Sequence, residues 1–460
     1  MTTRTNDELT GDEQQAVLAE LDEFLRIPSI STLSEHRPDM ERAATWVAEF
    51  LRRAGLDHAR VIPTSGHPLV YADWLHAPGQ PTILIYGHYD VQPPDPLDAW
   101  QSPPFEPTVR DGNLYARGAA DDKGQIFIHM KTVERLLRDG GTLPVNVRFL
   151  IEGEEETSGK SIEEYVQAHA DELACDAVLI SDSPMFAPDQ PTIGTGLRGA
   201  LFTELTVTTG RHDVHSGLYG GAAPNAIHAL CHILDALIDA EGRITIPGYY
   251  DAVRMPSDAE RAQWAALPFD ETAYREQEIG APALVGEAGF PVLERTWARP
   301  TLDVNGIWGG FTGEGSKAII PAQASAKVSM RLVPDQEPRQ ILAAFTRYVE
   351  QLCPAEARVT VRALTIGAPV LVDPDTPIMQ AAGAALRDVF GKPAVYTRMG
   401  GSIPIVSLFM ERLHAPTVML GFGLPDDNLH APNEKMRLAN IYDGIRASTA
   451  FLRRLTSAEC

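Results

Sequence analysis

Histidine and acidic side chains follow several apolar segments of this chain, in a combination that could hold metal ions. The set comprises His88 and Asp90, Asp121 and Asp122, Glu154 to Glu156, Asp182, and His430. Imidazole nitrogens combined with carboxylate oxygens suit Zn²⁺, Mn²⁺ or Co²⁺, whereas Ca²⁺ and Mg²⁺ favour shells of oxygen alone. So many carboxylates predict two ions, about 3.5–4 Å apart. Such a pair needs a shared ligand, and either Asp121 or Asp122 could bridge through its two oxygens.

Taken singly, each of these residues has an ordinary explanation. The acidic stretch at 152–159 could be a solvated turn, His88 a hydrogen-bonded structural histidine, and Asp121 and Asp122 the acids at a helix start. However, strand-like apolar runs precede His88, the glutamates, Asp182 and His430. Ligands of open α/β sheets bind outside the carboxyl ends of the strands. The sequence therefore predicts that these side chains share one rim of a sheet.

Alternating helix and strand patterns must position that rim. Helical spacing at 12–27, 39–55 and 123–140 alternates with strand-like runs at 69–75, 81–87, 145–151 and 176–181. The pattern then changes to strands at 200–210, 325–333 and 358–367, helices at 224–242 and 335–353, and a loop-rich insertion at 243–316. We predict an α/β catalytic domain, mainly a parallel sheet flanked by helices, with an inserted α+β lid or dimerisation domain. The catalytic domain spans 1–196 and 368–460, and the insert spans 197–367.

Composition excludes several classes of protein. At 460 residues the chain is too long for one ordinary core. Its net charge of −23 argues against a nucleic-acid or anionic-membrane partner. The polar N-terminal stretch predicts no secretory signal, and no apolar run approaches the roughly 20 residues that span a bilayer. The cysteines have scattered positions typical of reduced thiols in a cytoplasmic protein, namely Cys175, Cys231, Cys353 and Cys460.

Several segments resemble the M20 metallopeptidases, in particular the branch of carnosine-like and Cys-Gly dipeptidases. The matching segments run in the expected order over most of the chain and form a specific combination. They are GHYDVQP at 87–93, YARGAADDKGQ at 115–125, EGEEETSG at 152–159, SDSP at 181–184, RGALFTELTV at 198–207, HDVHSGLYGG at 212–221, MRLVP at 330–334, GGSIPI at 400–405, LGFG at 420–423 and NLHAPNE at 428–434.

The resemblance implies two divalent ions per subunit, with Zn²⁺ expected and Mn²⁺ or Co²⁺ as alternatives. It implies that His88 and Asp182 hold one ion, that Glu156 and His430 hold the other, and that Asp121 bridges them across a cis peptide to the next residue.

The remaining roles that the resemblance implies concern catalysis and substrate. Asp90 would orient His88, and Glu155 would be the general base, with Glu154 the alternative if the register slips by one. His215 would stabilise the oxyanion in the other subunit of a homodimer. Four residues would bind the substrate's free carboxylate, namely Arg331, Gly400, Gly401 and Ser402.

The predicted function is hydrolysis of the peptide bond of dipeptides or short peptides with a free C-terminal carboxylate, by a metal-bridging hydroxide. One alternative is an N-acyl amino-acid deacylase of the acetylornithine or succinyl-diaminopimelate type, although the long insertion at 243–316 favours a dipeptidase. A non-enzyme alternative is a catalytically silent metal- or peptide-binding protein on this scaffold, against which Glu155 counts. Ala318 and Met399 depart from the Thr and Glu that the family often has, so the exact substrate stays open.

Overall fold

The computed structural model describes residues 8–157, 159–401 and 403–456 and divides into two compact units. The first unit comprises Met1–Thr195, Val372–Tyr396 and Leu408–Cys460, and the second comprises Gly196–Leu371 and Thr397–Ser407. The predicted insert, 197–367, has ends close to those of the second unit. The segment 397–407, which the sequence placed in the catalytic domain, instead groups with the second unit.

Polar contacts explain this grouping. Arg398 is buried, and its Nη2 donates to Glu260 Oε1 at 2.6 Å. The Nε of Arg198 donates a hydrogen bond of 2.8 Å to the carbonyl oxygen of Gly400. The backbone nitrogen of Arg198 donates one of 3.1 Å to the carbonyl oxygen of Gly401. These contacts tie the segment to the second unit through partners that lie far away in the sequence.

The core of the first unit is a sheet with strand order β1-β2-β6-β3-β7-β17-β8. Its four central strands are parallel: β6 (Asn146–Glu152), β3 (Thr82–His88), β7 (Ala177–Ile180) and β17 (Thr417–Leu420). Antiparallel strands flank them: β1 (Asp57–Ile62), β2 (Leu69–Trp74) and β8 (Thr192–Leu197). Parallel strands need cover on both faces, which is why these segments are apolar throughout rather than alternating.

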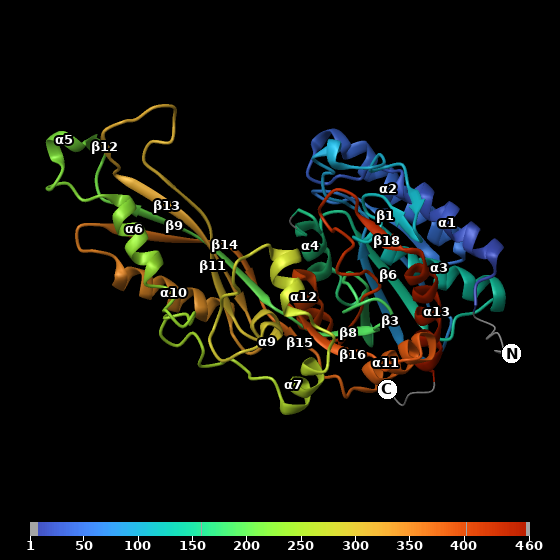
Figure 1. Cartoon of the computed structure of the whole chain (residues 1–460). Helices are drawn as coiled ribbons and strands as arrows, with labels where there is room; N and C mark the ends of the chain where they lie inside the picture. The colour runs from blue at the N-terminus through green and yellow to red at the C-terminus, as the bar shows by residue number, and fades with distance from the viewer. Residues whose placement is uncertain (1–7, 158, 402, 457–460) are drawn as a thin grey trace. The chain divides into compact units, whose positions relative to one another are not determined.

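Helices cover both faces of this sheet. A Cβ on Gly87 would lie 2.8 Å from Ile126 of α3, while the ring of Tyr86 packs at 5.4 Å against Phe409 of α12 on the other face. Figure 1 shows α1, α2, α3 and α13 together on one side. The helical elements of this unit are α1 (Gly11–Leu25), η1 (Ser34–His36), α2 (Arg37–Ala54), η2 (Leu97–Ala99), α3 (Lys123–Gly140), α4 (Lys160–Ala168), α11 (Pro377–Phe390), α13 (Leu438–Arg454) and α12 (Pro404–Leu413), which begins in the second unit.

A small three-stranded sheet in the same unit matters for the site. Its order is β18-β5-β4, with β4 at Thr108–Arg110, β5 at Asn113–Tyr115 and β18 at Lys435–Arg437. The antiparallel pairing of β5 with β18 places Tyr115 opposite Lys435. It therefore brings the segment after β5 beside the segment before β18.

The second unit is built on a four-stranded antiparallel sheet of order β11-β13-β9-β14. Its core combines Leu205 and Val328 of the sheet with Leu230 of α6 and Phe345 of α10. The strands are β9 (Gly199–Thr208), β11 (Thr301–Gly309), β13 (Gln323–Leu332) and β14 (Arg358–Gly367), and the two helices are α6 (Ala226–Asp235) and α10 (Pro338–Leu352). Shorter pieces complete the unit: β10 (Val214–His215), α5 (Ser216–Tyr219), β12 (Ile319–Ile320) and β15 (Val370–Leu371), while β16 (Val395–Met399) begins in the first unit.

The segment 243–316, expected to be loop-rich, is more ordered than its many Pro and Gly residues indicate. It contains α7 (Asp258–Ala265), α8 (Glu271–Ala273), the π-helical η3 (Tyr274–Ile279), α9 (Val292–Trp297) and the edge strand β11. Ser257 and Glu260 form a capping box that starts α7. A buried ion pair between Arg299 and Glu287 anchors the middle of the segment.

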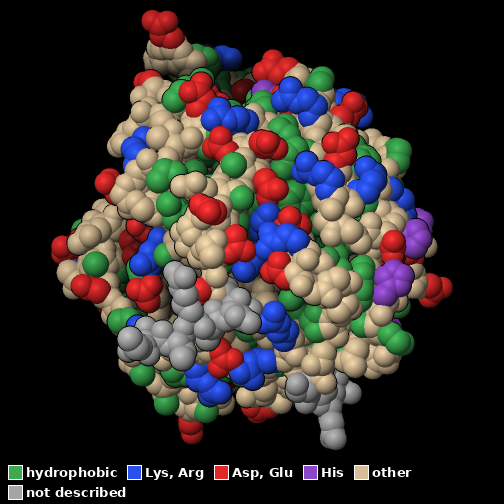
Figure 2. Space-filling model, turned by 90° about the vertical axis from the view of Figure 1, so that its right-hand side faces the viewer, with side chains coloured by type: hydrophobic (Ala, Val, Ile, Leu, Met, Phe, Trp, Pro, Cys, Tyr) green, Lys and Arg blue, Asp and Glu red, His purple; other side chains and the backbone are tan. Residues whose placement is uncertain are grey.

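Two further features concern the surface and possible partners. Acidic and basic side chains are interspersed over the face drawn in Figure 2, so the net charge of −23 is not gathered into one patch there. Within the described residues, none of the helices combines the length and apolar character needed to span a bilayer.

Candidate metal centre

Three parallel strands place the first group of candidate residues. His88 ends β3, the glutamates at 154–156 follow β6, and Asp182 follows β7. Both β6 and β7 pair with β3 in parallel, with His88 directly opposite Glu152. Their carboxyl ends therefore open onto one rim, as the sequence predicts.

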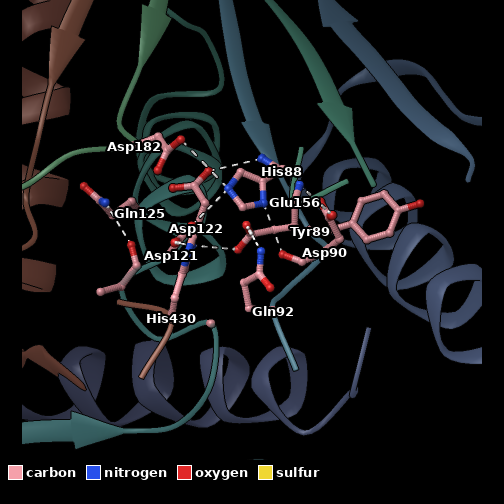
Figure 3. A network of polar contacts seen from close by, with 12 residues as sticks. His88, Tyr89, Asp90, Gln92, Asp121, Asp122, Gln125, Glu156, Asp182 and His430 are labelled. Atoms are coloured by element: carbon pink, nitrogen blue, oxygen red, sulfur yellow. Dashed lines mark hydrogen bonds and ion pairs between the residues drawn. The ribbon is translucent and has the colours of Figure 1, made fainter. Parts of the chain in front are cut away.

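The small sheet places the other two residues. Asp121 lies in the segment after β5, and His430 lies in the segment before β18. The peptide between Asp121 and Asp122 is cis, as the resemblance implies. Figure 3 shows both side chains beside those that follow the strands.

The five side chains that were predicted to be metal ligands form two groups. One comprises His88, Asp121 and Asp182, and the other Asp121, Glu156 and His430, with one ligand atom from each residue within 4.8 Å of the others in its group. Asp121 belongs to both because its two oxygens face different histidines. Its Oδ1 lies 3.2 Å from His88 Nε2, and its Oδ2 lies 2.8 Å from His430 Nε2. This is the arrangement that a bridging carboxylate needs.

The neighbouring acid is turned elsewhere. Asp122 Oδ2 accepts a hydrogen bond of 3.1 Å from the backbone nitrogen of His88. The sequence alone left Asp121 and Asp122 as equal candidates for the bridge. In the structure, Asp121 occupies the position shared by the two ligand groups, whereas the hydrogen bond of Asp122 anchors the end of β3.

The residues present fit divalent cations. His88 Nε2 and Glu156 Oε1 are buried, and within the described residues they form no hydrogen bond of good geometry. They have only close contacts, at 3.2 Å to Asp121 Oδ1 and 3.3 Å to His430 Nε2, although buried polar atoms are almost always hydrogen-bonded. Each group offers one imidazole nitrogen and at least two carboxylate oxygens. Such mixed sets match Zn²⁺, Mn²⁺ or Co²⁺, and cations would also relieve the repulsion between acids held this close.

Asp90 contacts one ligand of each group, His88 and Glu156, and helps to hold both in place. Its carbonyl oxygen is hydrogen-bonded to Nδ1 of His88 at 3.1 Å, and its Oδ1 lies 3.3 Å from the same nitrogen. Both contacts direct Nε2 of that ring toward the site. The Oδ2 of Asp90 accepts a hydrogen bond of 3.1 Å from the backbone nitrogen of Glu156. Gln92, which the sequence analysis did not single out, donates to Glu156 Oε2 at 2.8 Å. The only indication of Gln92 in the sequence is its place in the segment GHYDVQP.

Burial and charge shift the pKa values of the ligands in the metal-free protein. The hydrogen bond to Asp121, and then the close contact with Glu156, raise the pKa of His430 to about 10. Burial, followed by the charge of Asp121, raises the pKa of Asp182 to about 7. Burial opposes the charged form of His88, yet contacts with Asp121 and other acids raise its pKa well above the ordinary value. The shifts favour the protonated forms of these side chains in the metal-free protein, so protons compete with cations for the same atoms.

Glu155 stands beside the two groups without belonging to either. It forms no hydrogen bond to any residue that the structure describes. Burial, followed by the negative charges of Asp182, Glu156 and Asp90, raises its pKa to about 9, against the opposing charge of His88. A carboxyl group in this position can hold a proton and pass it on.

The rest of the acidic cluster has structural partners. Glu154 accepts hydrogen bonds from the backbone nitrogens of His67 at 2.8 Å and Ser161 at 3.0 Å. Glu152 accepts one of 2.6 Å from the hydroxyl of Tyr86. These contacts favour Glu155 over Glu154 as the base.

The predicted substrate residues all belong to the second unit. Arg331, on β13, is partly buried and lies 5.4 Å from the ring of Phe202. His215 caps α5 in an exposed position, and its Nδ1 accepts from the backbone nitrogen of Gly217. Ser402 lies outside the described residues.

The contact of Gly400 and Gly401 with Arg198 was missed by the sequence analysis. Burial, followed by the charge of Arg331, lowers the pKa of Arg198 to about 10. Arg198 begins the segment RGALFTELTV, but nothing in that segment shows that it reaches residues some 200 positions later.

Two mixed ligand sets that share one carboxylate are the arrangement on which two-metal hydrolases are built. Residues 84–454 match the profile of peptidase family M20/M25/M40, and the chain belongs to this family.

Named relatives support that assignment. The chain is 31% identical over 438 residues to the β-Ala-His dipeptidase of Homo sapiens, a match that covers 92% of this chain and 86% of the relative. It is 31% identical over 464 residues to the cysteinylglycine-S-conjugate dipeptidase of Corynebacterium striatum, covering 98% and 97%. The solved M20 family metallo-carboxypeptidase of Sulfolobus solfataricus superposes with a TM-score of 0.85 at 31% identity, covering 96% and 99%. The predicted family, its dipeptidase branch and the fold class are confirmed, and the chain is a metallopeptidase.

Proposed function

We propose that this metallopeptidase hydrolyses dipeptides or short peptides that end in a free carboxylate. The observation that carries the proposal is the position of Asp121, with one oxygen toward His88 and the other toward His430. The named dipeptidase relatives support the choice of substrate class. The similar metallo-carboxypeptidase supports extending that class beyond dipeptides.

Each residue of the centre receives one role. His88 and Asp182 hold one cation, Glu156 and His430 hold the other, and Asp121 serves both. When bound, the two cations lower the pKa of the attacking water and polarise the peptide carbonyl. Zn²⁺ is the proposed metal, with Mn²⁺ or Co²⁺ as alternatives that offer the same coordination chemistry.

Glu155 moves the protons. It accepts one from the attacking water and delivers it to the leaving amine, so that the amine departs uncharged. The positive charge of the cations would lower its pKa from about 9 in the metal-free protein toward neutrality. General acid–base catalysis of this kind contributes about 10²–10⁴-fold to the rate.

The second unit supplies substrate recognition. Arg331 binds the free carboxylate of the substrate, and the loop at Gly400 to Ser402 assists. His215 stabilises the oxyanion, acting on a second copy of the chain in a homodimer, which suits its exposed position at the start of α5. We place the enzyme in the cytoplasm, because Cys175, Cys231 and Cys353 are free thiols.

A substrate panel tests the activity. The metal-free protein is reconstituted with Zn²⁺, Mn²⁺ or Co²⁺ and assayed on Cys-Gly, β-Ala-His, a longer peptide and N-acetylornithine. Turnover of peptides with a free C-terminus is expected. Turnover of N-acetylornithine alone would establish the deacylase alternative, and no turnover with two bound cations would indicate a silent binding protein.

A matched pair of variants tests the base. Glu155→Gln should lower kcat by at least about 10²-fold while both cations stay bound. Glu154→Gln is the control: it replaces one of the two oxygens that accept from the His67 and Ser161 nitrogens with an NH₂ group, so it should lower stability but leave kcat near that of the wild type. The reverse pattern would make Glu154 the base.

A further inference from the structure

A buried carboxylate next to the centre makes hydrogen bonds that the reaction does not use. Glu434 is fully buried, and each of its oxygens accepts two donors. Oε2 accepts from Arg117 Nη1 at 2.6 Å and from the nitrogen of Gly118 at 3.0 Å. Oε1 accepts from the nitrogens of Ala120 at 2.9 Å and Asp121 at 3.1 Å. The carboxylate is therefore bound into the backbone turn that leads to Asp121.

Its partner Arg117 extends the network to two more segments. Arg117 is also buried, and its Nη2 donates at 3.3 Å to the carbonyl oxygens of Pro93 and Ala431. Pro93 follows the segment of His88 and Asp90, while Ala431 directly follows His430. One buried ion pair thus joins three chain segments that carry candidate ligands.

The neighbouring strands explain how this network forms. Pairing of β5 with β18 continues beyond the strand ends, where the nitrogen of Ala116 donates to the carbonyl oxygen of Glu434 at 3.1 Å. That contact places the Glu434 side chain under the turn at 117–121. A buried ion pair is sustained only when its remaining hydrogen-bonding atoms are satisfied, and four donors on one carboxylate meet that condition.

We infer that Glu434 and Arg117 are positioning residues that fix Asp121 and His430 in the geometry needed to bind the cation of the Asp121–Glu156–His430 group. Neither residue belongs to a ligand group. Their effect passes through the backbone: beyond the end of the β5–β18 pairing, their hydrogen bonds hold the segment of Asp121 against the segment of His430, and with it the two ligands. The inference rests on the proposed two-metal function.

The test compares Zn²⁺ binding by the metal-free wild type and Glu434→Gln, using competition with a chromophoric chelator. Glutamine matches the size of glutamate but has one acceptor oxygen in place of two, so two of the four donors would face an NH₂ group. Loss of support behind metal ligands typically weakens metal binding by about 10–100-fold. We expect a loss of that size at one of the two Zn²⁺ sites, with a smaller loss at the other.

Glu287→Gln is the matched control. Glu287 is a buried carboxylate of the second unit that accepts two hydrogen bonds from Arg299, at 2.7 and 2.8 Å. Its replacement should lower the Tm without changing either Zn²⁺ dissociation constant. If Glu434→Gln behaves in the same way, with a lower Tm and unchanged Zn²⁺ binding, the residue is merely structural and the inference is wrong.

A second variant covers the case in which Glu434→Gln does not fold. Arg117→Lys keeps a positive charge beside Glu434 but loses the branch that holds Pro93 and Ala431. It should fold and should also weaken Zn²⁺ binding at one site, and unchanged binding would again contradict the inference. A wild type that binds fewer than two Zn²⁺ ions would instead overturn the proposed function, so the two failures are distinguishable.

Discussion

Cation binding at the Asp121–Glu156–His430 group should displace a proton from His430. In the metal-free protein, Nε2 of this ring lies 2.8 Å from Asp121 Oδ2 and 3.3 Å from Glu156 Oε1. The hydrogen bond to Asp121 and the close contact with Glu156 raise the pKa of His430 to about 10. The same nitrogen must lose its proton before it can bind a metal ion. Proton and cation therefore compete for one position.

The size of the effect follows from the pKa. At pH 7, about three units below it, roughly one ring in a thousand is neutral. Each cation bound there then releases about one proton, so the apparent association constant should rise about tenfold per pH unit between about pH 6 and pH 8.5. The same pKa shift also determines how the stability of the metal-free protein depends on pH. Because folding raises this pKa, the protonated ring stabilises the metal-free fold fully below about pH 6.5, and this contribution is lost as the pH rises through about 10.

Competition with a chelator of known pH dependence measures the slope, and calorimetry in buffers of different ionisation enthalpy counts the protons. His58→Gln is the control, because Asp73 also raises the pKa of His58 but that residue belongs to neither ligand group. Its slope should equal that of the wild type. An association constant that stays flat over this range, with the same enthalpy in every buffer, would refute the protonated state assigned to His430.

Two further changes test the supports of the site. Asp90→Asn should weaken Zn²⁺ binding by about 10–100-fold in the same competition assay, because the carboxylate contacts both the His88 ring and the backbone nitrogen of Glu156. Arg198→Met removes a charged donor to the Gly400 carbonyl oxygen, and such hydrogen bonds contribute about 1.5–3 kcal/mol. It should raise KM roughly tenfold or more for a free dipeptide. It should change KM little for the C-terminally amidated analogue, as steady-state kinetics of the two substrates will show.

The sequence predicts much of the first unit because its signals are local. A buried parallel strand is a continuous apolar run, and a polar residue directly after it must lie at the rim of the sheet. That rule places His88, the glutamates after β6, and Asp182 without knowledge of the rest of the fold. The structure brings them together with Asp121 and His430, although their individual roles stay predictions.

Features that depend on side-chain direction or on distant contacts could not be predicted from the sequence. Asp121 and Asp122 are chemically identical neighbours, and only the turn between β5 and α3 decides which one faces the histidines. The strand β11 lies in a segment rich in Pro and Gly, where pairing with β13 over its whole length outweighs weak local propensity. The segment 397–407 joins the second unit through Arg398 and Arg198, whose partners no local pattern reveals.

The ligands of the two groups are held in place in different ways, either by strands of the sheet or by buried contacts between loops. The features that the sequence could not predict therefore affect one ligand group more than the other. His88 and Asp182 follow neighbouring strands of one sheet, whose hydrogen bonds fix their spacing. Asp121 and His430 lie in loops, and loops hold a precise geometry only where buried contacts lock them. Glu434 and Arg117, which belong to neither ligand group, supply such contacts. Damage to this network should therefore weaken the loop-borne group more than the strand-borne one, which explains why Glu434→Gln is expected to affect the two Zn²⁺ sites unequally.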